Sequence, residues 1–206
     1  MISTPTLAPA TADVLLELVN IGVGRAARGL SELTGREVTM TIPTLELINH
    51  TAGDHVLESC HGITIRVSQA FSGGIGGHAM LVLNRAGAVR LAELLLGKEA
   101  GDDAFDVNEQ GAMLELGNIV IGNVIGLLAS ELDAPVEYEM PQLQLRGTKN
   151  YIDLISDIVD PRLAKVIIMR ASLSIREDRI SGYFLMMFPD TSLAGLISKL
   201  TCLATP

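Results

Sequence analysis

The stretch Leu16-Glu-Leu-Val-Asn-Ile-Gly-Val-Gly24 returns 98 residues later as Leu114-Glu-Leu-Gly-Asn-Ile-Val-Ile-Gly122. The likeness continues without a gap to Leu47 and Leu145. Eleven of these 32 paired positions are identical, whereas unrelated segments of ordinary composition share roughly two or three. In the first copy the identical residues are Leu16, Glu17, Leu18, Asn20, Ile21, Gly24, Leu30, Val38, Pro43, Leu45 and Leu47. The chain of 206 residues therefore contains an internal duplication.

Each copy has the pattern of a long helix followed by strands and a second helix. Apolar residues at helical spacing predict long helices over about residues 11–34 and 108–132. Two strands are expected around the proline of each copy, the first of them over residues 37–42 and 136–140. Short apolar runs predict further strands over residues 63–67, 79–83, 166–175 and 180–188, and final helices over residues 88–96 and 192–200.

These elements predict an α+β fold built from two halves, residues 12–97 and 108–203, related by a pseudo-two-fold axis. The stretch from residue 85 to 106 is mostly helical in pattern and leaves no room for a flexible linker. We therefore expect residues 1–206 to form a single domain, in which both halves share one mixed sheet and one core.

Composition excludes several classes of function. The formal net charge of −9, the absence of Trp and the 3% aromatic content argue against nucleic-acid binding, which needs basic and stacking surfaces. Residues 1–11 lack the pattern of a signal peptide, and no apolar run approaches the roughly 20 residues of a membrane span. Cys60 and Cys202 have no CxxC partner, so we expect reduced thiols in a cytoplasmic protein without a membrane partner.

A polar stripe recurs on both long helices. Glu17 and Asn20 in the first copy, and Glu115 and Asn118 in the second, are three residues apart and therefore share one helix face. A single Glu-x-x-Asn is usually just a solvated face, and its recurrence could be inheritance from a duplicated ancestor. Neither explanation accounts for Asn and Gly beside so many apolar residues, because both disfavour helices. A surface that a partner approaches closely does account for them. The remaining stripe positions are Asp13 and Gly24 in the first copy, and Gly111 and Gly122 in the second.

The same residues resemble the CheC/CheX/FliY family of phosphatases. The family pattern is an acidic residue or Ser, three residues, Glu, two residues, Asn, 22 residues and Pro. The first copy matches fully, with Asp13, Glu17, Asn20 and Pro43. The second copy has Glu115, Asn118 and Pro141 but Gly111 at the acidic position. The resemblance covers nearly the whole chain, and its length and two sites favour the CheC type over the shorter CheX type and the longer FliY type.

The resemblance implies hydrolysis of the aspartyl-phosphate on a CheY-like response regulator. The metal ion and Lys that neutralise the phosphoryl group belong to the regulator, so no cofactor or metal of the phosphatase itself is implied. Asn20 and Asn118 would orient the attacking water, and Glu17 and Glu115 would dock on the regulator's Lys. Pro43 and Pro141 would shape the ends of their strands.

Three other interpretations remain open. The middle domain of the flagellar switch protein FliM shares the family's fold without its Glu-Asn pairs, so a non-catalytic interaction module is one alternative. An adaptor that binds the deamidase CheD, a family partner, is a second, and it could coexist with catalysis. A small-molecule enzyme is a third, although no cofactor motif supports it.

Other patterns carry no chemistry. Gly73-Gly-Ile-Gly-Gly77 lacks the GK[ST] ending of a phosphate loop and is expected to be a hairpin turn. The four histidines, His50, His55, His61 and His78, have no metal-binding spacing. We expect the Glu and Asn of both pairs to face solvent. Because only the first copy has the acidic residue, we expect the Asn20 site to contribute more activity.

Overall fold

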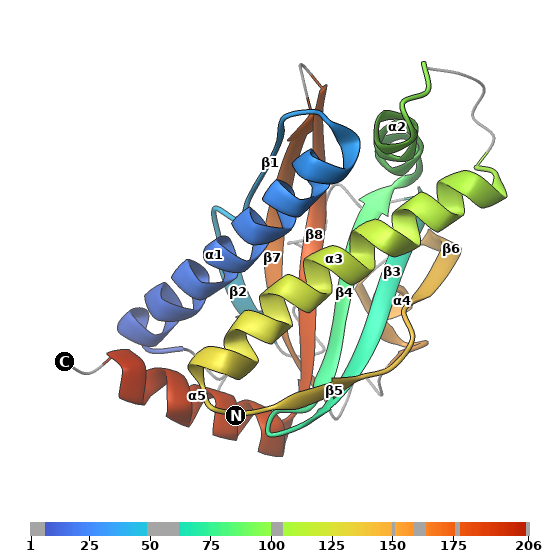
Figure 1. The fold of residues 1–206 in the computed structure, drawn as a ribbon. Coiled ribbons are helices and arrows are strands. Elements are labelled where there is room, and N and C mark those ends of the chain that lie inside the picture. Colours follow the sequence, from blue (N-terminus) through green and yellow to red (C-terminus); the bar gives the residue numbers. More distant parts are fainter. Residues whose placement is uncertain are drawn as a thin grey trace.

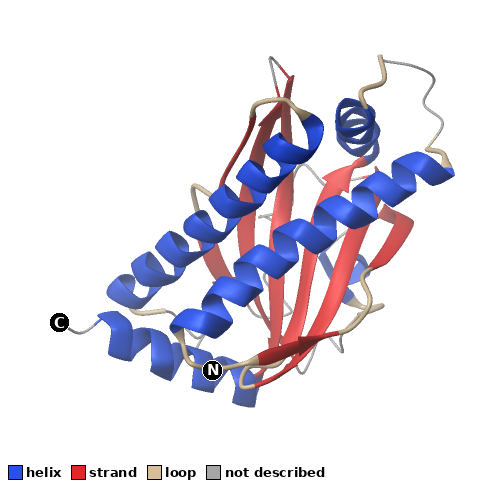
Figure 2. Cartoon of the chain, viewed as in Figure 1, coloured by secondary structure: helices blue, strands red, loops and turns tan. Residues whose placement is uncertain are grey.

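The computed structural model describes residues 7–48, 62–99, 105–149, 151–158, 164–175 and 178–204 (Figures 1 and 2). The first half contains α1 (Pro9–Thr34), β1 (Val38–Thr41), β2 (Leu45–Ile48), β3 (Gly62–Gly73), β4 (Gly77–Asn84) and α2 (Arg85–Leu96). The second contains α3 (Val107–Glu131), β5 (Val136–Tyr138), β6 (Gln142–Thr148), α4 (Tyr151–Ile155), β7 (Ala164–Ile175), β8 (Asp178–Pro189) and α5 (Asp190–Ala204). The predicted order of elements therefore repeats, with α4 added in the second half.

The eight strands form one sheet in the order β1-β7-β8-β4-β3-β5, with β2 also on β7 and β6 also on β3. The short strands of each half thus pair with a long strand of the other half. Strand β1 pairs with β7, and β5 pairs with β3. Every described pairing is antiparallel, so the α+β fold with one shared sheet is confirmed, whereas the expectation of a mixed sheet is wrong. The reason is that no helix crosses over between neighbouring strands, as a parallel pair requires.

The two long helices lie side by side across one face of the sheet (Figure 1). They approach most closely at Gly22, where a Cβ would lie 2.8 Å from the Cα of Val124. The helix α5 packs against α1, and α2 packs against α3. The main core lies between this helical layer and the sheet, and residues of both halves line it, including Leu15, Val19, Met113 and Phe184.

Local sequence explains where the helices begin and end. Asp106 caps α3, since its carboxylate accepts a hydrogen bond from the Glu109 N–H while Glu109 accepts one from the Asp106 N–H. Gly35 ends α1 in the left-handed conformation, with φ of 63°. By length and composition α3 could cross a membrane. It instead lies in the core, because Met113, Val120 and other residues along it are fully buried.

The opposite face of the sheet carries α4 and a smaller apolar cluster. Arg66 lies at its edge with 1% exposure, and its guanidinium donates hydrogen bonds to the Thr148 hydroxyl at 2.7 Å and to the carbonyls of Asp153 and Leu154. These contacts attach α4 to β3 and use the donors of the buried guanidinium, whose charge is offset by the Asp157 carboxylate at 3.9 Å.

The glycine-rich segment forms the β3–β4 turn, as predicted, since Phe71 pairs with Gly77. Gly73 has φ of 123°, and a Cβ there would lie 2.4 Å from the Pro135 carbonyl oxygen. A close passage of the α3–β5 connection therefore requires glycine, and no phosphate loop forms here.

Candidate functional site

The first stripe runs along the outer side of α1. Asp13, Glu17 and Gly24 are exposed, and a Cβ at Gly24 would have no neighbour within 4 Å. Within the described part of the chain, the carboxylates of Asp13 and Glu17 have neither a hydrogen bond nor an ion pair. Two unpaired carboxylates therefore stand on an open helix face.

Asn20, in contrast, is half-buried, and its side-chain amide is hydrogen-bonded to the backbone just beyond the end of β1. Its Nδ2 donates to the Ile42 carbonyl at 2.8 Å and to the Leu16 carbonyl at 3.0 Å, and its Oδ1 accepts from the Ile42 N–H at 2.9 Å. The expectation that Asn20 faces solvent is therefore wrong. The physical reason is that the β1–β7 ladder stops at Thr41, so the backbone groups of Ile42 need another partner.

The second stripe keeps its polar groups available. Glu115 and Asn118 are exposed on α3, as predicted. Glu115 has no partner among the described residues, and Asn118 has only one hydrogen bond, in which its Oδ1 accepts from Gln69 Nε2 at 3.4 Å. The Nδ2 of Asn118 is left with both donors unused. The Asn118 amide can therefore bind a water or an incoming group, whereas both donors of Asn20 are occupied.

Sequence reasoning missed Gln69, which lies on β3 and is 95% buried. Its Nε2 also donates to the Glu139 carbonyl at 2.8 Å, just beyond the end of β5. No local signal marks this residue, because its contacts arise only from the pairing of β3 with β5 across the two halves. The position of Gly117 contributes as well, since a Cβ there would lie 2.3 Å from Val67 Cγ1 and would hold α3 away from β3.

The remaining sequence-predicted residues lie where the stripes predict them. Gly111 is exposed and Gly122 is half-buried on α3, and neither would bring a Cβ near another residue. Pro43 lies in the short connection between β1 and β2, and Pro141 lies between β5 and β6. Pro43 thus directly follows Ile42, whose backbone groups Asn20 binds.

The apolar surroundings of the two sites also differ. Met140 is 84% exposed next to Pro141, whereas Ile42, its counterpart in the first copy, is 1% exposed. Tyr138 is also partly exposed beside α3, and burial on its other side raises the pKa of its hydroxyl. The second site therefore combines an open amide, a carboxylate and exposed apolar side chains, which is a composition suited to a protein partner.

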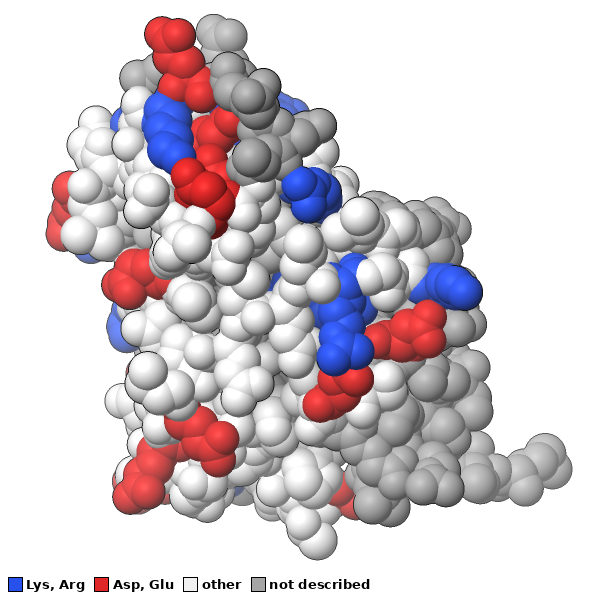
Figure 3. Space-filling view, turned by 90° about the vertical axis from the view of Figure 1, so that its right-hand side faces the viewer, with Lys and Arg blue, Asp and Glu red and all other residues white. Residues whose placement is uncertain are grey.

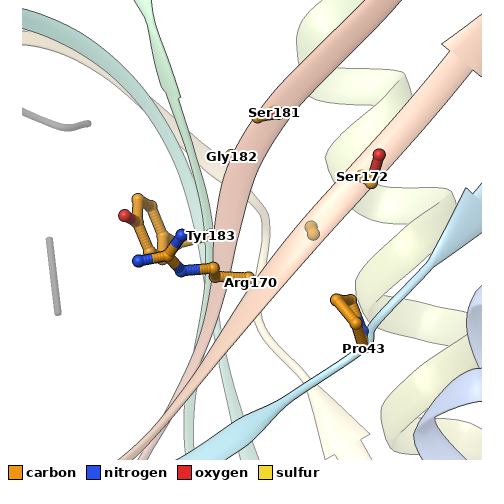
Figure 4. Close-up of a pocket in the computed structure, with 7 residues that line it drawn as sticks. Pro43, Arg170, Ser172, Ser181, Gly182 and Tyr183 are labelled. Atoms are coloured by element: carbon orange, nitrogen blue, oxygen red, sulfur yellow. The ribbon is translucent and has the colours of Figure 1, made fainter. Parts of the chain in front are cut away.

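Other hollows in the described part of the chain offer less chemistry. Pro43 lines a shallow cavity of about 230 Å³, in which Arg170 and Tyr183 lie close together while Ser172 and Ser181 stand apart (Figure 4). Its lining includes no carboxylate or histidine, so it holds no acid–base pair. On the same face of the sheet, His78 lies in a second hollow. Desolvation lowers the pKa of His78, an effect that the nearby Glu139 carboxylate opposes.

Charge is distributed in small mixed groups. On the side of the molecule shown in Figure 3, the upper and right-hand parts carry mixed acidic and basic groups, the lower left carries acidic groups alone, and much of the surface is uncharged. One mixed group lies between the end of α2 and the start of α3, where Lys98 Nζ lies 3.2 Å from Glu109 Oε1 and 3.3 Å from Asp106 Oδ2.

No group of His, Cys, Asp and Glu among the described residues has the arrangement of a metal site. His50, His55, His61 and Cys60 lie outside the described residues, and Cys202 is an exposed free thiol.

Comparison with known proteins places these residues in context. The family model described as "CheC-like family" matches residues 11–47, which include the complete first motif and its proline. The "CheY-P phosphatase CheC" of Bacillus subtilis (strain 168) is 25% identical over 143 residues, 65% of each chain. The chain is a homologue of CheC and FliY. The "Flagellar motor switch phosphatase FliY" of the same organism is 25% identical over 197 residues, 91% of this chain. The match spans 65% of the length of CheC and 48% of that of FliY.

Solved structures confirm the fold. Thermotoga maritima FliY superposes with a TM-score of 0.77 at 21% identity, covering 96% of this chain and 99% of that one. The middle domain of Helicobacter pylori FliM gives 0.64 at 16% identity, covering 93% and 99%. The chain from the CheX-CheY-BeF3-Mg+2 complex of Borrelia burgdorferi gives 0.51 at 17% identity, covering 84% and 99%. This homologue of CheC and FliY thus shares its fold with FliY, the FliM middle domain and CheX, and function must be argued from the site.

Proposed function

We propose that this protein is a phosphatase that hydrolyses the aspartyl-phosphate of a CheY-like response regulator. The observation that carries the proposal is the exposed Glu115–Asn118 pair, whose amide donors and carboxylate are unengaged on an accessible helix face. The names of the Bacillus subtilis relatives, CheY-P phosphatase and flagellar motor switch phosphatase, support the reaction, and the CheX–CheY complex supports the kind of partner. Such a pathway would place the protein in the cytoplasm.

In this proposal the Asn118 side chain binds the attacking water. Phosphoryl transfer needs mainly positioning and charge stabilisation, and the regulator supplies the charges through its own metal ion and Lys. A neutral amide suits the remaining task, because it holds a water by hydrogen bonds without repelling the phosphoryl oxygens. Glu115, one helical turn away, docks on the regulator's Lys and sets the helix over the phosphoryl group.

The glycines of the stripe support close approach by a partner. A glycine within a helix costs about 1 kcal/mol relative to alanine, and internal packing does not require glycine at Gly24 or Gly122. A partner's backbone that comes close to the helix would require it. The exposed Met140 adds an apolar contact at the rim of the second site.

The first site is proposed to contribute mainly to docking. Both Nδ2 donors of Asn20 bind backbone carbonyls, and its Oδ1 already accepts a hydrogen bond from the Ile42 N–H. Only one acceptor position on Oδ1 therefore remains for a water. Glu17 and Asp13 remain free to bind a cationic partner group. We therefore assign the greater share of turnover to Asn118, the reverse of the ranking that the sequence favours.

The experiment is a dephosphorylation time course with the response regulators of the source organism. Wild type should shorten the lifetime of at least one phospho-regulator, and the double variant Asn20→Ala/Asn118→Ala should restore the intrinsic lifetime while keeping its circular dichroism spectrum. An unchanged lifetime with the double variant would eliminate the mechanism.

A second candidate is a non-catalytic interaction module, because the fold also superposes on the FliM middle domain. In that case the exposed face of α3 binds a switch-like partner, or the deamidase CheD, without chemistry. The two candidates differ in one result. The module would bind its partner but leave every phospho-regulator lifetime unchanged, with or without Asn118.

A further inference from the structure

We propose that Gln69 is a positioning residue that keeps the Asn118 amide available for the reaction, and that Ala171, its counterpart, allows Asn20 to be captured by the backbone. This inference rests on the proposed function. It explains why the side-chain amide of Asn20 is hydrogen-bonded to the backbone while that of Asn118, at the same motif position, keeps its donors open.

The strand register defines the two counterparts. Tyr138 pairs with Phe71 in the second site, and Met40, which occupies the same place in the repeat, pairs with Leu173 in the first. Two residues earlier on these partner strands are Gln69 and Ala171. Both belong to the face of the sheet that the helices cover, since Phe71 and Leu173 contribute to the main core. Besides the differences already described, the duplicated sites therefore differ in the residue of the partner strand that lies beneath the helices, which is Gln69 in one and Ala171 in the other.

The contacts of Gln69 account for the difference. Its Nε2 donates to the Glu139 carbonyl and to Asn118 Oδ1, so one buried amide group holds both the strand end and the oxygen of Asn118. With its oxygen held inward, Asn118 presents its Nδ2 outward. In the first site the methyl group of Ala171 has no hydrogen-bonding capacity. Asn20 there binds the N–H and carbonyl of Ile42, which lies one residue beyond Thr41, the counterpart of Glu139.

The amide oxygen of Gln69 indicates a role beyond packing. Its Oε1 is buried and accepts no hydrogen bond from the described residues. A buried acceptor without a partner is unfavourable, and an apolar residue of similar size would pack without that penalty. A glutamine with an unpartnered buried oxygen is understandable here because its Nε2 donors hold the Asn118 amide. Active sites commonly hold their reacting groups through a supporting residue of this kind.

The experiment measures the second site alone, in an Asn20→Ala background. Adding Gln69→Ala should let Asn118 turn onto the backbone near Met140, and we expect kcat to fall roughly ten- to hundredfold while KM changes little, because orientation rather than docking is lost. The matched control is Gln144→Ala. Gln144 is another strand glutamine with an unpartnered buried Oε1, but it lies opposite Arg66 on the far face of the sheet. That variant should retain kcat.

The reciprocal change tests the same idea at the first site. In an Asn118→Ala background, Ala171→Gln should donate to Asn20 Oδ1 in competition with the Ile42 N–H, turn the amide of Asn20 away from the backbone and raise the remaining activity several-fold. A loss of function from poor folding cannot mimic this gain. An unchanged or reduced kcat for a folded Ala171→Gln variant, together with an unchanged kcat for Gln69→Ala, would overturn the proposal.

A readout without catalysis separates this inference from the proposed function. Side-chain amide NMR should show slow hydrogen exchange for Asn20 and fast exchange for Asn118 in the wild type. In Gln69→Ala the exchange of Asn118 should slow towards that of Asn20. If the wild type proves inactive on every regulator but this exchange shift occurs, the phosphatase proposal fails and the positioning role stands. If exchange is unaffected, the positioning role fails whatever the activity.

Discussion

At the scale of single residues, two asparagines in the same motif have acquired different physical roles. Asn20 substitutes for the missing ladder partner of Ile42, so its amide is part of the structure. Asn118 has a single long hydrogen bond and remains exposed. The Glu and Asn of the motif and their spacing are the same in both copies, whereas the strands beside the two asparagines carry different residues. Stability measurements should therefore separate the two residues clearly.

Asn20→Ala should lower the free energy of unfolding by about 2 kcal/mol or more, because the N–H and carbonyl of Ile42 both lose their partner in a partly buried place. Asn118→Ala should change it by less than about 0.5 kcal/mol, as expected for an exposed side chain. Urea denaturation of the two variants provides a matched comparison. Equal stabilities would show that the amide of Asn20 is not needed to hold the strand.

Gly111 gives a second residue-level prediction, because it stands where the first copy has Asp13. Gly111→Asp should lower the KM for the phospho-regulator by about two- to fivefold, the value of an exposed ion pair, with little change in kcat. Gly111→Ala is the control that separates charge from helix propensity. A change confined to kcat would contradict a docking role for this position.

At the scale of elements, the approach of α3 to β3 determines where the second site lies. Gly117 permits this contact, because a Cβ there would lie 2.3 Å from Val67 Cγ1. The exposed Gly111 on the same helix has no such neighbour. The two glycines therefore form a natural pair for testing whether the helix–strand distance is fixed by packing.

Gly117→Ala should destabilise the protein by about 1–3 kcal/mol, since the added methyl group overpacks the contact with Val67. Gly111→Ala should stabilise it by up to about 1 kcal/mol through helix propensity alone. Thermal denaturation of both variants checks the pair. Stabilisation by Gly117→Ala would mean that the helix can move away from the strand at little cost.

The sequence predicted the elements with clear periodicity and missed those without it. The bounds of α1 and α3 lie within two residues of the prediction, because long apolar stripes and caps define such helices. The short helix α4 was not predicted, since it has only five residues. The strand β6 was expected beyond Pro141 but without bounds, since Gln142–Thr148 is largely polar. The stripe residues could also be predicted, because they depend on one helix. The environment of each Asn could not, because it depends on strands from the other half.

At the scale of the whole molecule, the exchange of strands joins the halves into one folding unit. The strands β1 and β2 find their partner β7 only in the second half, and β5 and β6 find β3 only in the first. The helices α1 and α3 also pack on each other. The superposition of residues 12–97 on residues 108–203 stays a prediction, but the halves depend on each other for their edges.

Separate fragments covering residues 1–99 and 100–206 should therefore be unfolded or aggregated alone and should recover cooperative unfolding when mixed. The physical reason is that each fragment alone exposes strand edges and half of the core. Circular dichroism melts of the fragments, their mixture and the full chain nicked in the same segment would show this. Cooperative melting of either fragment alone would contradict the single folding unit.

The most direct test of the account is the lifetime of a phosphorylated CheY-like regulator with each single asparagine variant. We expect Asn118→Ala to reduce the dephosphorylation rate roughly ten- to hundredfold, because it removes the amide that positions the water. Asn20→Ala, assayed where it is folded, should retain most of the activity. A full rate with Asn118→Ala, or a greater loss with folded Asn20→Ala, would contradict the claim that the exposed amide on α3 carries the chemistry.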